Sequence, residues 1–448
     1  MKTNVNPTTE LLDHYHDAFV HFEAHAIGRD LNWLRDLRRN GFARFYEVGF
    51  PTTHDEDWRF TNVSPISQTP FRISRDGHQG IAYQQVRQFQ MQDAACHLVF
   101  LNGRFARGLS AFEHLPQRVT VGSLAEEIQR GAVEVERHLG RYLDQQRDSF
   151  AALNTAFVED GAYVHVQRGA IVDRPIQLIF ISLAGSEPTA IQPRNLILAD
   201  EACQCEIVED YVSLGGGTAF CNTVTELVSG ESSIVSHYMI EREHPNAFNV
   251  STLRIEQGRN SRVASHSLLL GGALVRNNVH PVIAGEGAEC VINGLFLGTD
   301  RQHMDNYMLV EHASPHGASR QFYNGILDQS AHGVFHGRII VHKDAQRTDA
   351  KQTNRNLLLS DDAQIDTKPQ LEIHADDVKC THGATIGQLD EDALFYLRTR
   401  GLDEASARRL LLLAFAGEYL DRIENASSRS FAETMVTTWM NRFGENQS

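Results

Sequence analysis

The sequence predicts a mainly β protein built around a stacked β-solenoid, with helical regions at both ends. From about residue 155 the chain consists of short Val, Ile and Leu runs separated by Gly, Ser and acidic turns. Small residues recur in these turns about every 30 residues without helical periodicity, which is typical of solenoid coils. Amphipathic helical patterns occupy the first 40 residues and the part of the chain after residue 390.

The first region, residues 1–155, is expected to be a helical or mixed domain. Apolar residues recur at helical spacing within residues 8–40, and they form two faces that are separated near Asp30. A further helical pattern covers residues 124–143. The segments between these patterns are irregular.

The solenoid core is expected to span residues 156–387. Eight turns carry a small residue followed by a strand-like run, at Ala202, Ser233, Ser261, Ala288, Ala318, Ala331, Ala345 and Ala363. An antiparallel sandwich could produce a similar pattern. Few Asn-Gly or Asp-Gly turns join these runs, however, so hairpins are not favoured.

The last region, residues 388–448, is expected to be a helical domain. Asp390 opens one helix that ends at Gly401, and Asp403 caps a second helix whose apolar band is wider than one face. A final helix is expected from about Ser430 to Phe443. The surplus apolar residues either pack within the chain or form a strip for a partner.

Composition excludes several classes of function. The chain has 448 residues, with 41 basic and 57 acidic residues and a net charge of −16, so nucleic acid is not an expected partner. No apolar run approaches the ~20 residues that span a bilayer, and the first residues have no signal-peptide core. Six scattered cysteines without a C-x-x-C pair indicate reduced thiols. We therefore expect a cytoplasmic protein with no membrane association.

Residues 371–387 carry the strongest chemical signal in the chain. With the two-residue period of a strand, one face of this segment gathers imidazoles, carboxylates and a thiol. The members of this face are Glu372, His374, Asp376, Val378, Cys380 and His382. Sulfur and imidazole together suit iron or zinc better than magnesium or calcium, so the segment predicts a metal-binding or cluster-binding edge.

Cys380 and His382 are the first candidates at this edge. Because they are two residues apart on a predicted strand, both side chains point to one side and could share a metal ion or a cluster iron. An imidazolium beside the thiol would also favour ionisation of the thiol. The alternative is that both side chains pack or form hydrogen bonds at the end of the solenoid.

His374, Cys203 and Cys205 are secondary metal candidates. His374 shares the predicted face but lies further back, and the alternative is a surface residue of the last coil. Cys203 and Cys205 form another pair with a spacing of two, which would suit a second metal site or a persulfide-handling site. The alternative, which we favour, is that these thiols stack inside the solenoid.

The segment from Leu371 to Gly401 resembles the signature of the SufD-type subunit of the SUF iron–sulfur cluster assembly scaffold. The matching residues are Leu371-Glu372-Ile373, Ala375-Asp376-Asp377-Val378, Cys380, His382-Gly383-Ala384-Thr385, Gly387, Asp390, Phe395-Tyr396-Leu397 and Arg400-Gly401. Upstream matches are Ala345-Gln346-Arg347-Thr348, Gln352 and Asn356-Leu357-Leu358-Leu359-Ser360, and a weaker block near the start contains Gly49, Pro51, Glu56, Trp58, Arg59, Phe60 and Thr61. The resemblance spans most of the chain and is most specific between about residues 330 and 415.

This resemblance implies a right-handed parallel β-helix that pairs with a SufB-type paralogue. It places the family's cluster-forming histidine on His382 and the neighbouring cysteine on Cys380. Because iron–sulfur clusters usually need about four ligands, the partner chain would supply the others, and the iron or cluster would be transient and shared. The resemblance also allows a homodimer when the chain is alone.

The resemblance further implies that the C-terminal helices dock a SufC-type ATPase. The docking residues would be Phe395, Tyr396, Leu397, Arg398, Arg400, Gly401, Leu411 and Phe415. The chain would then be a non-catalytic scaffold, and ATP hydrolysis would belong to the partner. The alternative hypothesis is a β-helix enzyme that acts on polysaccharide, or a histidine–metal hydratase.

Overall fold

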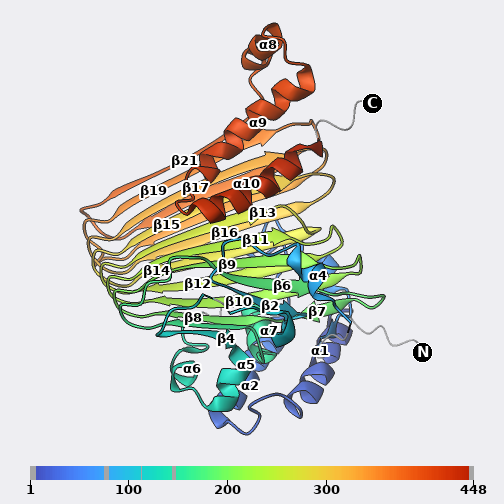
Figure 1. The fold of residues 1–448 in the computed structure, drawn as a ribbon, viewed down its shortest axis with the longest axis vertical. Coiled ribbons are helices and arrows are strands. Elements are labelled where there is room, and N and C mark those ends of the chain that lie inside the picture. Colours follow the sequence, from blue (N-terminus) through green and yellow to red (C-terminus); the bar gives the residue numbers. More distant parts are fainter. Residues whose placement is uncertain (1–6, 75–79, 113, 144–147, 443–448) are drawn as a thin grey trace.

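The computed structural model describes residues 7–74, 80–112, 114–143 and 148–442. Two long, mainly parallel sheets face each other and form a β-solenoid of about eight turns, with helices at both ends (Figure 1). The predicted fold class is therefore confirmed. The coils stack because each strand pairs in parallel with the strand one coil earlier and the strand one coil later.

We call the two sheets sheet A and sheet B, and their terminal strands position the candidate site. Sheet A contains β4 (Val119–Ser123), β5 (Ala162–Val166), β8 (Arg194–Ala199), β10 (Ala219–Ser229), β12 (Phe248–Gln257), β14 (Leu274–Ile283), β16 (His303–His312), β18 (His332–Val341) and β20 (Gln364–Ile373), with β1 (Arg72–Ile73) and β7 (Thr189–Ile191) beside this path. Sheet B contains β3 (Arg104–Phe105), β2 (Cys96–Leu101), β6 (Ile176–Ser182), β9 (Gln204–Ser213), β11 (Ile234–Arg242), β13 (Arg262–Leu269), β15 (Glu289–Gly298), β17 (Ala318–Leu327), β19 (Asp349–Leu358) and β21 (Lys379–Gly387). Strands β20 and β21 are the last members of their sheets.

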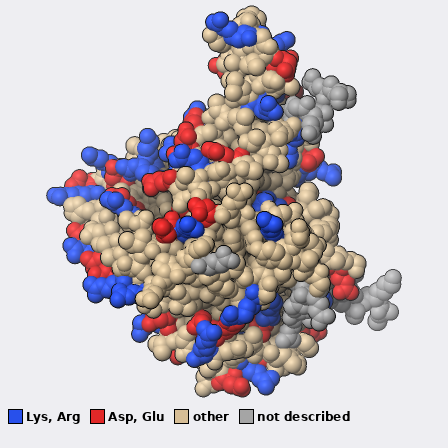
Figure 2. All heavy atoms as spheres, in the orientation of Figure 1, with Lys and Arg blue, Asp and Glu red and all other residues tan. Residues whose placement is uncertain are grey.

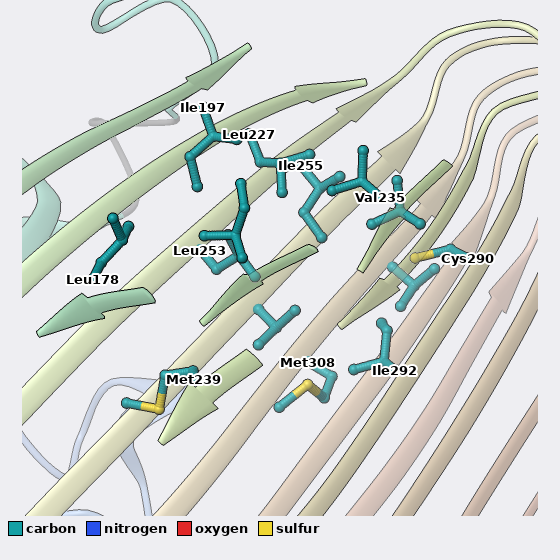
Figure 3. Close-up of a cluster of buried hydrophobic side chains, with 14 of the residues drawn as sticks. Leu178, Ile197, Leu227, Val235, Met239, Leu253, Ile255, Cys290, Ile292 and Met308 are labelled. Atoms are coloured by element: carbon teal, nitrogen blue, oxygen red, sulfur yellow. The ribbon is translucent and has the colours of Figure 1, made fainter. Parts of the chain in front are cut away.

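The space between the sheets, which we call the lumen, holds the main core. Alternate residues of each strand point into it, as Val235 and Met239 of β11 and Leu253 and Ile255 of β12 do (Figure 3). Burying one such aliphatic side chain is worth about 1.5–3 kcal/mol. Most residues of the middle strands are buried, polar as well as apolar, because both faces of these strands are covered.

The recurring small residues lie at the corners between strands. Ser233 and Ser261 are fully buried, and their hydroxyls donate to the carbonyls of Gly230 and Gly258 at 2.8 Å. The preceding residues, Ser232 among them with φ of 57°, adopt left-handed backbone conformations that turn the chain. A small residue follows because the turn leaves little room beneath it.

Most of the N-terminal region covers the early coils on the outer face of sheet A, whereas α4 (Tyr83–Arg87) and η2 (Arg107–Leu109) pack on the outer face of sheet B. Its other helices are α1 (Pro7–Glu23), α2 (Asn32–Val48), η1 (Glu56–Trp58), α3 (Ser64–Ser67), α5 (Leu124–Arg130), α6 (Val133–His138) and α7 (Ser149–Ala156). An aromatic-rich cluster from α1, α2 and α7 packs against Phe220, Val250 and Leu274 of sheet A. The two helices expected within residues 8–40 are confirmed. The pattern over residues 124–143 forms two short helices, because Gly131 ends the first in a left-handed conformation.

The C-terminal region consists of α8 (Glu391–Thr399), α9 (Glu404–Leu420) and α10 (Ala426–Met440). Helices α9 and α10 pack on the outer face of sheet B, whereas α8 projects away from the body (Figure 1). The predicted caps are confirmed, because Asp390 accepts from two backbone N–H groups and Asp403 from that of Ser406. Phe443, where we expected the last helix to end, lies outside the described residues. No helix among the described residues is both long and apolar enough to span a membrane.

Candidate functional site

Cys380 and His382 lie on the inner face of β21, at the open end of the lumen. Strand β21 pairs with β19 so that Cys380 is opposite Ala350 and His382 is opposite Gln352. Ala350 and Gln352 are buried and alternate with more exposed residues, so their face of sheet B is the lumen face. The prediction that the two candidates share one side of a strand is therefore confirmed.

Strand β21 is much more exposed than the other long strands of sheet B. Its residues are all exposed except Cys380, which is half-buried and packs against the lumen core. In the earlier coils the next coil covers the same positions, but no described strand covers β21. The ring of His382 is consequently accessible to a second molecule, while the sulfur of Cys380 lies slightly deeper.

The surroundings of Cys380 favour the protonated thiol. Partial burial is the largest effect and raises the pKa of Cys380 above its usual value, and the carboxylate of Asp349 raises it further. A hydrogen bond from the backbone of Ala350 acts in the opposite direction. The expected ease of ionisation is therefore not found in the isolated chain, and an additional cation would be needed to favour the thiolate.

The expectation that residues 371–382 form one strand was wrong. Strand β20 ends at Ile373 in sheet A, and β21 begins at Lys379 in sheet B. Between them the chain turns a solenoid corner at which Ala375 is buried and the carbonyl of Asp377 accepts from the backbone N–H of Arg347. The alternation of side chains therefore does not continue across the segment.

This corner separates His374 from Cys380 and His382. His374 directly follows β20 and is exposed at the end of sheet A. The Glu372 side chain lies on the face of β20 that points away from the lumen, and it forms an ion pair with Arg338. Among the described residues, no group of three or more His, Cys, Asp and Glu side chains is arranged to hold a metal ion. Cys380 and His382 would thus supply at most two ligands of a shared centre.

Cys203 and Cys205 are buried in the core near the beginning of β9. Their exposed fractions are 1% and 3%, and burial raises the pKa of Cys203 to about 11 and that of Cys205 further. Both sulfurs belong to the same apolar cluster as the lumen core. This environment supports the packing alternative for the pair.

The residues expected to dock a partner fall into two groups. Phe395 and Tyr396 on α8 are 69% and 56% exposed, and the Arg400 guanidinium lies 5.0 Å from the Tyr396 ring centroid. The exposed group also contains Arg398 and Gly401, and basic and acidic side chains lie close together at this tip (Figure 2). Leu397, Leu411 and Phe415 are half-buried, and the Phe415 carbonyl accepts from the Asn324 amide of β17. Phe415 therefore helps to hold α9 on sheet B.

The sequence interpretation missed two exposed apolar residues at the open end of the solenoid. Ile373 at the end of β20 is 41% exposed, and Ile386 on β21 is 52% exposed. Their apolar character in a strand was visible in the sequence, but only the sheet order shows that no further coil of the described chain covers them.

Comparisons with known proteins agree with this arrangement. The family model described as "SUF system FeS cluster assembly, SufBD core domain" matches residues 180–415, and the model for the SufBD protein N-terminal region matches residues 7–178. The chain belongs to the SufB/SufD family.

Several relatives cover most of the chain. A SufBD family iron–sulfur cluster assembly protein of Synechocystis is 36% identical over 417 residues, which span 90% of this chain and 91% of that protein. SufD of Escherichia coli is 29% identical over 381 residues, with coverage of 84% and 86%. A chloroplastic protein of Arabidopsis thaliana, ABCI7, is 28% identical over 411 residues, with coverage of 90% and 85%. The predicted relationship to the SufD-type proteins is thus confirmed, and it links the chain to iron–sulfur cluster assembly.

Proposed function

We propose that this chain is a non-catalytic scaffold subunit that assembles iron–sulfur clusters with a SufB-type paralogue and a SufC-type ATPase. The observation that carries the proposal is the position of Cys380 and His382, side by side on the exposed terminal strand at the open end of the lumen. Family membership supplies the chemistry to which such a site would contribute. The nascent cluster is the cargo of this site and is shared with the partner.

The free edges of β20 and β21 suit edge-to-edge pairing with a second solenoid. Each strand pairs on one side only among the described residues, with β18 and β19 respectively. A terminal strand presents unpaired N–H and C=O groups that an incoming strand can satisfy, so exposed edges are natural sites of β-augmentation. The same contact would cover Ile373 and Ile386. A paralogue with the same fold offers two matching edges. A second copy of this chain would pair at the same edges, but with lower affinity.

Such pairing would place the partner's ligands beside His382. The imidazole would bind or admit iron, and the remaining ligands, chiefly thiolates, would come from the paralogue. Cys380 lies deeper and is mainly protonated before assembly, so we assign it the secondary role. We call the contact between the two solenoids the seam. A cation at the seam would favour the thiolate form of Cys380.

The C-terminal helices would connect the seam to the ATPase. The exposed tip of α8, with Phe395 and Tyr396, would dock the ATPase, while α9 is anchored on β15 and β17 of sheet B. Movement of two ATPase subunits would then pull on the solenoid near its open end. A differential binding energy of a few kcal/mol is sufficient to shift a two-state seam between closed and open forms.

The scaffold proposal is preferred to an enzyme acting on polysaccharide or to a histidine–metal hydratase. Membership of the SufB/SufD family supports the scaffold, and ATP turnover would belong to the ATPase partner. The cytoplasmic location stays a prediction, because one relative is a chloroplastic protein.

The main test is His382→Ala in the complex co-expressed with its paralogue and ATPase and purified without oxygen. We expect intact assembly but a loss of bound iron, sulfide and visible absorption. Thr381→Ala is the matched control, because Thr381 is exposed on the same strand and points to the opposite side. Cys380→Ser should reduce cluster content less than His382→Ala does. A normal cluster content in His382→Ala would refute the assigned role.

A second test concerns the helical tip. Phe395→Asp should prevent co-elution with the ATPase while the paralogue remains bound, since the charged residue would have to be buried in the contact. Val133→Asp provides a control, because Val133 is 66% exposed and lies in the N-terminal region. Retention of the ATPase by Phe395→Asp would remove α8 from the docking surface.

A further inference from the structure

Gln352 is the neighbour of His382 on the preceding coil. In the register of sheet B, Gln321 of β17, Gln352 of β19 and His382 of β21 occupy the same position on the lumen face. Neighbouring strands are about 4.8 Å apart, so equivalent side chains of successive coils lie directly over one another. Three polar side chains therefore follow each other toward the open end.

The Gln352 amide is enclosed and only partly satisfied. Its side chain is 1% exposed, and Nε2 donates to Oε1 of Gln321 at 2.9 Å. A Cβ at Gly337, on the facing strand β18, would lie 1.8 Å from Nε2, so this glycine provides the space for the amide. Oε1 of Gln352 has no hydrogen-bond partner among the described residues. A buried carbonyl oxygen without a donor is unfavourable and is rare in native proteins.

The direction of the amide pair indicates where the missing donor lies. In a ladder of stacked amides, each side chain donates to one neighbour and accepts from the neighbour on the other side. Gln352 donates toward Gln321, whose own Nε2 is also without a partner among the described residues. On the other side of Gln352, the in-register residue that can donate to its free oxygen is His382. The His382 ring is exposed and takes part in none of the hydrogen bonds of the described residues, so it is free to rotate toward this oxygen.

We propose that Gln352 is a positioning residue for His382, accepting a hydrogen bond from one ring N–H and so leaving the other ring nitrogen to bind iron. This inference rests on the proposed function of His382. A histidine ligand commonly donates its second N–H to an oxygen acceptor, which fixes both the tautomer and the orientation of the ring. Gln352 would supply that acceptor from within this chain before any partner arrives.

The test is the tautomer of His382 in the full-length chain, measured by long-range ¹H–¹⁵N NMR on histidine-labelled protein at a pH where the ring is neutral. His382→Ala identifies the signal. We expect one tautomer to dominate in the wild type, and Gln352→Leu to change the tautomer ratio about fivefold, the effect of one hydrogen bond. Gln352→Glu retains an acceptor oxygen and should restore the dominant tautomer.

Asn354→Leu is the matched control. Asn354 is a fully buried amide on the same face of the same strand, but it lies opposite Ala384. It should disturb packing to a similar degree without changing the His382 tautomer. An unchanged ratio in Gln352→Leu, or an equal change in Asn354→Leu, would overturn the inference.

Cluster content of the co-expressed complex separates the two proposals. If Gln352→Leu alters the tautomer while His382→Ala leaves cluster content normal, the positioning contact stands and the cluster role of His382 fails. If His382→Ala abolishes the cluster but Gln352→Leu leaves the tautomer unchanged, the scaffold function stands and the positioning role fails.

Discussion

Cys205, Cys290 and Cys380 occupy equivalent positions on the lumen face of three different coils. The register of sheet B connects them through the intervening strands, and their backbones are equivalent. Cys205 and Cys290 are 3% and 1% exposed, and burial raises the pKa of Cys290 to about 12. Cys380 is half-buried at the open end. The same residue type thus has a structural role in the middle coils and an accessible position in the last coil.

His237 and His382 make the same comparison for imidazole. They also share one position along sheet B, but His237 is 1% exposed and its ring contacts Glu209 at 3.2 Å and Ser265 at 3.3 Å. His382 is exposed and forms no hydrogen bond of this kind with the residues that the structure describes. The position of a coil in the stack, and not the residue type, therefore determines whether a lumen-facing side chain is available for chemistry.

The largest expected difference is in thiol reactivity. Of the six free cysteines, Cys380 alone should react with a maleimide in the folded chain, faster as the pH rises toward its raised pKa. Cys290 can react only after the lumen opens. An opening free energy of about 5 kcal/mol would slow its reaction by at least about a thousandfold. Peptide mapping by mass spectrometry over time measures both rates. Similar labelling of Cys290 and Cys380 would break the comparison, and binding of the paralogue should protect Cys380.

Removing an ion pair should lower the stability of the chain more in the early coils than in the last coil. Arg194 and Glu226 are 0% exposed and 2.6 Å apart, so Glu226→Ala leaves a buried guanidinium without its counter-charge. We expect a loss of about 3–5 kcal/mol, measured by the urea midpoint. Asp377→Ala removes an exposed pair with Arg347, whose charged atoms are 3.7 Å apart, and should leave the midpoint unchanged. Equal effects of the two substitutions would mean that the last coil is covered in the isolated chain.

Apolar residues of the lumen face provide a third comparison. Ile292→Ala in the closed lumen, where Ile292 is 0% exposed, should cost about 2–4 kcal/mol of unfolding free energy. Ile386→Ala, at 52% exposure, should change the stability of the isolated chain by less than about 0.5 kcal/mol. In the complex, Ile386→Ala should weaken pairing with the paralogue, measured by titration of one subunit into the other. Full-strength pairing would place the interface elsewhere.

The sequence predicts the solenoid because its corners repeat and several of them bury a small residue. Ser233 and Ser261 lie fully buried beneath their turns, so the spacing of the coils is visible as a spacing of small residues. The shared face of Cys380 and His382 was equally predictable, because the period of two holds within one strand.

The end of β20 was missed because alternation alone does not show where a strand stops. The corner at residues 374–378 contains no glycine or proline, and its acidic residues continued the apparent pattern. A signal was nevertheless present, since Ala375 follows the buried corner residue Ala345 at the usual length of a coil. The Gln321–Gln352–His382 series could not be predicted in this way, because it depends on the register between strands.

The smallest expected effect is a pH dependence that distinguishes a covered coil from the open one. Glu206 of β9 lies beneath α10 and accepts a hydrogen bond from the Ser428 hydroxyl. Burial raises the pKa of this carboxyl from 4.5 to about 7, with a smaller contribution from Glu424. The unfolded chain therefore loses this proton at lower pH than the folded chain does, and the contribution of Glu206 to stability is lost as the pH rises from about 4.5 through about 7.

Glu206→Gln keeps an acceptor for Ser428 but cannot ionise. It should match the wild type at pH 4.5 and be more stable by about 1–3 kcal/mol at pH 8, as measured by urea midpoints across this range. Glu372→Gln is the control in the last coil, where the half-exposed carboxylate pairs with Arg338 and solvent screens the charge. If Glu206→Gln retains the pH dependence of the wild type, α10 does not cover β9 tightly. Packing inside the lumen, and not coverage by α10, would then exclude solvent from the early coils.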